Sequence, residues 1–110
     1  MNGYNVLTDA VRLIGLETPD DSLKIRGLAM INTILCELGY HPIRLLSQKT
    51  EVYSAVAVQA LIVGTAMLIA NSLGDSDCRN ALSSAYNDIR RSAMGNINRI
   101  RDVMPKGDVL

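Results

Sequence analysis

The chain of 110 residues contains no phenylalanine and no tryptophan, and only four tyrosines and one histidine. It has two cysteines and a formal net charge of zero. A core without Phe or Trp must be packed with aliphatic side chains, and a single domain is expected at this length. Two cysteines suit a reducing compartment better than a disulfide-stapled scaffold. Zero net charge gives no overall attraction to nucleic acid or to a membrane surface.

The sequence also lacks the motifs of the common catalytic and cofactor sites. It has no phosphate-binding glycine loop, no zinc-ligand pattern and no nucleophile with a histidine base. The one histidine, His41, stands before a proline, which places it in a loop. The acidic pairs Asp20-Asp21 and Asp75/Asp77 stand where helices are expected to begin, so capping accounts for them. We therefore expect no enzyme activity, no cofactor and no metal site.

What the sequence does contain is a long stretch, Val52 to Gly74, without a charged residue. Apolar residues lie on every side of a helix built from it, so either protein or lipid surrounds the helix. Its length would allow it to cross a membrane. However, many of its residues are alanines, Gln59 and Asn71 are strongly polar, and no aromatic pair or charge bias marks two interfaces. We expect a helix buried among other helices, with Gly64 allowing close packing; a small membrane protein is a further alternative.

Three other segments show the spacing of three and four residues that is typical of helices. Their apolar positions are Tyr4, Leu7, Val11 and Ile14; then Leu28, Ile31, Leu35 and Leu38; and then Cys78, Leu82, Ala85, Ile89 and Ala93. Capping residues predict helix starts at Asp20 to Ser22, at Thr50 or Ser54, and at Ser76-Asp77. Gly15, Gly39 and Gly74 are the predicted ends.

These segments predict an all-α fold, a small four-helix bundle with the almost wholly apolar third helix at its centre. Residues 40–51 form the connection before that helix. Gly95 is expected to break or end the last helix, although the segment after it has helical spacing. The bundle is therefore assigned to residues 1–95, and residues 96–110 to a loose, basic C-terminal tail.

Basic residues gather near the C-terminus, at Arg90, Arg91, Arg99, Arg101 and Lys106. No acidic residue lies between Arg90 and Arg101. Two interpretations are open: a solvated face, or a contact with phosphate or with an acidic partner surface. No aromatic residue is interleaved, so stacking of single-stranded bases is not indicated. If the helix continues past Gly95, Arg79, Arg90 and Arg101 recur every three turns near one face.

Several of these motifs occur together in one family. They are the run Gly64, Ala66 and Ala70; the turn Gly74-Asp75; Tyr86 followed by Arg90 and Arg91; the first-helix pattern Asp9, Ala10, Ile14 and Gly15; and the segment LLSQKTEVY before the long helix. With this pattern the chain resembles the head–tail connector, or head-completion, proteins of tailed bacteriophages, which bind the portal after DNA packaging. Gly95 and the apolar character of residues 52–60 depart from the family pattern.

The resemblance implies a structural protein that forms a ring, dodecameric in the virion, on the portal vertex. It implies that the ring extends the DNA channel and binds a tail or stopper protein. The implied location is the head–tail junction of the virion, and the bacterial host cytoplasm during assembly, with no membrane partner. The five basic residues would contact portal protein or packaged DNA. The alternative is a small helical nucleic-acid-binding or regulatory module of phage or prophage origin, using the same arginines.

Overall fold

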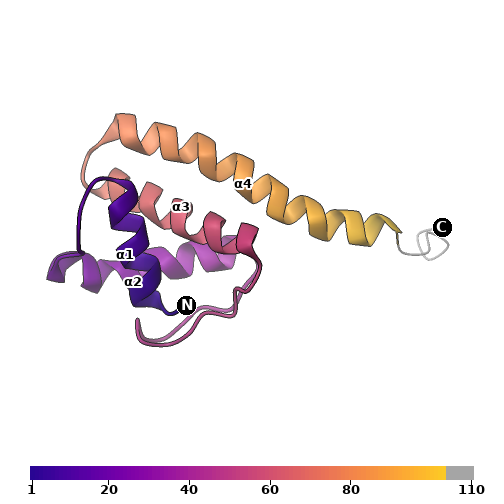
Figure 1. Ribbon diagram of the computed structural model, residues 1–110, viewed down its shortest axis with the longest axis horizontal. Helices are drawn as coiled ribbons and strands as arrows, with labels where there is room; N and C mark the ends of the chain where they lie inside the picture. Colours follow the sequence, from indigo (N-terminus) through magenta and orange to yellow (C-terminus); the bar gives the residue numbers. More distant parts are fainter. Residues whose placement is uncertain (104–110) are drawn as a thin grey trace.

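The computed structural model describes the backbone of residues 1–103 and the side chains of residues 1–93. The chain forms four helices: α1 (Gly3–Leu13), α2 (Asp21–Glu37), α3 (Ala55–Ser72) and α4 (Ser76–Val103) (Figure 1). Apart from an isolated bridge between Asn2 and Lys49, the described residues contain no β-structure. The predicted all-α, four-helix architecture is confirmed.

Side chains at the helix starts accept hydrogen bonds from backbone N–H groups that have no partner inside the helix. The caps are Asn2 for α1, Asp20 for α2, Ser54 for α3 and Asp75 for α4. Asp20 and Ser54 are among the predicted starts. The capping expected of Asp75 is confirmed, because its carboxylate accepts from the backbone N–H of Cys78 at 3.1 Å. The helix thus begins one residue earlier than a cap at Ser76-Asp77 would place it.

The three predicted end glycines all terminate helices. Gly15, Gly39 and Gly74 have φ values of 88°, 85° and 77°, in the left-handed region that favours glycine. The residue after each glycine donates its backbone N–H to the carbonyl oxygen of the residue five positions before it. Asp75 N, for example, donates to Ala70 O at 3.0 Å. This pattern satisfies carbonyls that the last turn leaves free.

Gly95 does not end α4, so the predicted break there is wrong. The helix is continuous from Ser76 to Val103, over 28 residues. A glycine inside a helix costs only about 1 kcal/mol relative to alanine, whereas a proline costs about 3, and the next proline is Pro105. The backbone of residues 96–103 is therefore helical; residues 104–110 of the predicted tail lie outside the described residues.

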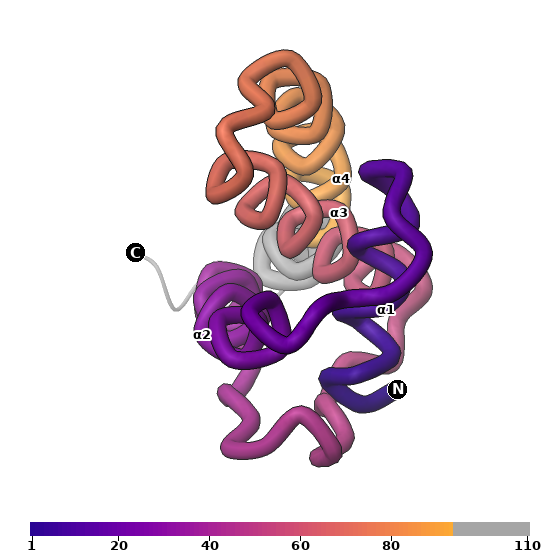
Figure 2. Tube along the Cα trace, turned by 90° about the vertical axis from the view of Figure 1, so that its left-hand side faces the viewer, coloured from indigo at the N-terminus to yellow at the C-terminus, as the bar shows by residue number. Residues whose placement is uncertain are grey.

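The third helix is the centre of the fold, as the sequence predicts. It contacts α1, α2 and α4, and the contact with α4 is the most extensive; Figure 2 shows it between the other three. Leu61, Ala66 and Ile69 are fully buried. Within the described residues it is also the one helix that is long and apolar enough to cross a membrane, but half of it is buried inside the fold.

The close packing predicted for Gly64 is confirmed. Side chains from two other helices, Tyr86 of α4 and Ile34 of α2, lie against its Cα position. α4 runs antiparallel to α3 and lies alongside it (Figure 1). At Gly64, α3 is therefore in contact with both α4 and α2.

The connection between α2 and α3 is held in place by one side chain that sequence reasoning overlooked. The Asn32 amide donates to the carbonyl oxygen of Ile43 at 2.8 Å and accepts from the N–H of Ile43 at 2.9 Å. The N-terminus adds further bonds, such as Tyr4 N to Leu46 O at 3.1 Å. The connection is therefore an ordered part of the bundle.

Candidate functional site

The five basic residues predicted as a partner-binding site all lie on or beyond the second half of α4. Arg90 is half-buried and Arg91 is exposed. Arg99 and Arg101 occupy positions on the helical backbone, but their side chains lie outside the described residues, and Lys106 lies outside entirely. Because α4 is continuous, Arg90 and Arg101 fall three turns apart near one face of the helix.

Arg91 is a surface charge. Its guanidinium lies 4.0 Å from the Asp88 carboxylate, one turn earlier, and the two side chains are 81% and 75% exposed. Such exposed pairs contribute little to stability, because water and salt screen both charges. Arg91 therefore remains open to an approaching acidic group or phosphate.

Arg90 differs from Arg91 although they are neighbours in sequence. Its Nε atom is buried and has no hydrogen-bond partner among the described residues. It lies one turn after Tyr86 on the same side of the helix, and its positive charge partly opposes the upward shift in the pKa of Tyr86. Arg90 thus belongs partly to the fold, and substituting it perturbs the α4 packing as well as the surface charge.

Tyr86 joins α4 to the end of α2. Its side chain is 3% exposed, and its hydroxyl donates a hydrogen bond to Glu37 Oε2 at 3.0 Å. Burial raises the pKa of Tyr86 well above its ordinary value, and the bond to Glu37 and the charge of that carboxylate raise it further. Sequence reasoning included Tyr86 only as part of the family pattern. Its position between Leu82 and Ile89 in the apolar stripe of α4 was the signal that it is buried.

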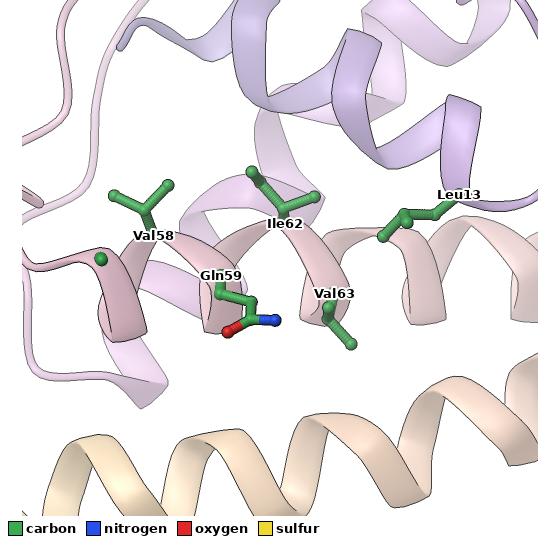
Figure 3. Close-up of a pocket in the computed structure, with 6 residues that line it drawn as sticks. Leu13, Val58, Gln59, Ile62 and Val63 are labelled. Carbon is green, nitrogen blue, oxygen red and sulfur yellow. The ribbon is translucent and has the colours of Figure 1, made fainter.

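A second surface feature is an apolar groove on α3 that the sequence did not predict. Its lining residues are Leu13, Ala55, Val58, Gln59, Ile62 and Val63, around a volume of about 440 Å³. In Figure 3, Val58 and Ile62 lie on the side facing α1, and Gln59 and Val63 on the side facing α4. The expectation that protein surrounds α3 on every side is therefore wrong for its first half, where this groove is open.

The described residues also define what these surfaces can do chemically. Residues 1–93 hold no group of three or more metal-ligating side chains, and His41 lies exposed in the connection between α2 and α3. The groove offers apolar contact and one amide, and the α4 arginines offer positive charge. Both features are suited to binding another macromolecule through its surface.

Comparisons with known proteins give no match: none to a protein-family model, none to a curated protein and none to a solved structure. The resemblance to phage head–tail connectors therefore stays a hypothesis that rests on the motifs in the sequence.

Proposed function

We propose that this protein is a head–tail connector, or portal adaptor, of a tailed bacteriophage. In this proposal it is a structural virion protein that binds the portal as a ring after DNA packaging and extends the DNA channel toward the tail. The observation that supports this proposal most strongly is the length of α4 relative to the bundle. The helix has 28 residues, whereas α3, its antiparallel neighbour, has 18.

The register of these two helices locates the part of α4 that extends past α3. Tyr86 packs against Gly64, and α3 begins nine residues before Gly64, at Ala55. In antiparallel helices of equal rise, α4 therefore passes the start of α3 at about residue 95. Figure 1 shows α4 extending beyond the other three helices. Residues 96–103 form a helical arm on a compact block.

This shape supports the roles that the resemblance implies. The whole chain has a formal net charge of zero, so copies can pack side by side with little charge repulsion. The arm carries Arg99 and Arg101 away from the block, so they can reach an acidic surface of the portal or the packaged DNA. The proposed partners are the portal, a tail or stopper protein, and further copies in a dodecameric ring. The proposed location is the virion head–tail junction, after assembly in the host cytoplasm.

The test is binding to the portal protein of the same genome, measured by co-sedimentation and electron microscopy. We expect the full chain to bind, and a chain lacking residues 96–110 to lose binding while keeping its melting temperature within a few degrees. Arg91→Glu is expected to weaken binding, whereas Arg12→Glu, an exposed arginine on α1, is the matched control. Normal portal binding and normal head completion without residues 96–110 would contradict the proposal.

The nucleic-acid-binding alternative makes a different prediction for the same sample. The isolated protein would then bind duplex DNA with an affinity that falls steeply as salt rises, because arginine–phosphate contacts release counterions. The connector predicts little affinity of this kind for the isolated protein. Strong, salt-dependent DNA binding in the absence of portal binding would favour the alternative and overturn the connector.

A further inference from the structure

The apolar stripe by which α4 packs on the bundle continues in the sequence beyond the bundle. Leu82, Tyr86 and Ile89 are packed against the hydrophobic core. The spacing of three and four residues then continues through Ala93 to Ile97, Ile100 and Met104. Because α3 of the same chain begins at Ala55, it lies alongside α4 only to about residue 95. The continued stripe therefore needs a different apolar surface.

The groove on α3 is such a surface. Five of its six lining residues are apolar, and Leu13 at its edge is 51% exposed. The α3 residues in it recur at spacings of three and four, so they form a trough along the helix axis. An apolar trough on a helical bundle is the usual receptor for one face of an amphipathic helix.

The lengths of the two features match. At about 1.5 Å per residue, the arm of residues 96–103 extends ~10 Å along the helix axis, and the groove from Ala55 to Val63 extends ~12 Å. The arm cannot occupy the groove of its own chain while α4 stays helical, because it leads past Ala55 and away from Val63. An arm that fills the groove of one copy must therefore come from another copy.

We propose that the groove receives the arm, residues 96–103 of α4, from a second copy of this chain. The inference rests on the proposed function in that it names the contact that joins neighbouring subunits of the ring. One patch binds a different patch, so each copy both gives an arm and accepts one. A contact of this type generates a closed ring, or an open chain when the rotation does not close.

Cysteine cross-linking tests the contact directly. In a chain carrying Cys36→Ser and Cys78→Ser, Val58→Cys is combined with Ile100→Cys and the concentrated protein is oxidised. We expect a ladder of covalent multimers on non-reducing gels. The matched control combines Ile100→Cys with Ile25→Cys, which is 80% exposed on α2 and outside the groove, and is expected to stay a single band. Only monomer from the first pair, whether cross-linked internally or not at all, would overturn the inference.

A mixing experiment tests the head-to-tail arrangement. Gln59→Asp places a negative charge in the groove at an exposed position, and Ile100→Asp places a charge of the same sign in the arm, so the altered groove and the altered arm also repel each other. We expect each variant alone to self-associate at least tenfold more weakly than the unmodified chain, by light scattering. An equimolar mixture should stop at dimers, because only one intact arm and one intact groove remain for each pair. An unchanged mass for both variants would overturn the inference.

These readouts need no portal, so they separate the two proposals. A covalent ladder from a chain that does not bind the portal would keep the arm–groove contact and reject the connector function. Portal binding by a chain that forms no ladder would reject the contact alone.

Discussion

The ring of Tyr86 lies so close to Gly64 that no side chain fits between them. A Cβ atom on Gly64 would be 2.7 Å from Cε1 of Tyr86 and 3.0 Å from two carbon atoms of Ile34. A distance of 2.7 Å does not persist between two carbon atoms, so a larger residue at this position must displace the Tyr86 ring and crowd the Ile34 side chain. The present positions of these two side chains against α3 therefore require a glycine here.

We predict that Gly64→Ala destabilises the fold by about 1–2 kcal/mol. Overpacking a core typically costs 1–3 kcal/mol, and the higher helix propensity of alanine returns up to about 1 kcal/mol. Denaturant unfolding measures the change. The control is the same substitution in a Tyr86→Leu background, where the ring is gone and the cost should be smaller. A Gly64→Ala protein that is more stable than the unmodified chain would contradict this packing.

The buried hydroxyl of Tyr86 predicts a loss of stability at high pH. Its pKa is raised in the folded protein above the usual value near 10, so the folded state holds this proton more tightly than the unfolded state. The resulting stabilisation is complete below pH ~10 and declines as the pH rises above it. Tyr86→Phe lacks this titration and loses the bond to Glu37, at a cost of about 0.5–1.5 kcal/mol at neutral pH.

The measurement is the difference in unfolding free energy between the unmodified chain and Tyr86→Phe, from pH 7 to pH 11. We expect a constant difference up to about pH 9 and a shrinking advantage of the unmodified chain above it. A difference that stays constant through pH 11 would show that this hydroxyl is not buried in the folded state.

We predict that Asn32→Ala costs about 2–3 kcal/mol. It leaves both the N–H and the C=O of Ile43, a residue that is buried, without the partners that Asn32 supplies, and buried polar groups of this kind are costly. Thr33→Ala, next in sequence and exposed, is the control and should change stability by less than about 0.5 kcal/mol. Hydrogen exchange at the Ile43 amide should rise in the first variant only. Equal stability of the two variants would show that Asn32 does not hold the connection between α2 and α3 in place.

The core position of α3 is tested by a charge at Leu61. Its side chain is fully buried, so Leu61→Asp must bury an unpaired carboxylate at a cost of several kcal/mol. We expect no cooperative thermal transition by circular dichroism. Gln59→Asp, two residues away and exposed, should melt almost as the unmodified chain does. An unchanged melting curve for Leu61→Asp would show that α3 does not lie in the core.

Local signals in the sequence were enough to predict most of this fold. Gly15, Gly39 and Gly74 end helices because each takes a left-handed conformation, and capping at Asp20 and Ser54 depends on residues close by in sequence. The same local reasoning wrongly predicted a helix end at Gly95, because one glycine does not outweigh the helical preference of its neighbours.

The candidate site was predicted less completely, because it depends on contacts between helices. The sequence identified the arginines of α4 but did not separate half-buried Arg90 from exposed Arg91. That difference depends on which face of α4 packs on the bundle, where Tyr86 is buried one turn before Arg90. The groove was missed because its open side depends on where α1 and α4 cross α3, and Asn32 was missed because its partner lies eleven residues away.

The most direct test of the account is electron microscopy of the concentrated full-length protein, alone and with portal, together with its mass from light scattering. The account predicts annular particles whose mass is a multiple of the 12.0 kDa chain, and loss of these rings when residues 96–110 are removed. A protein that stays monomeric at every concentration and forms no ring with the portal would contradict it.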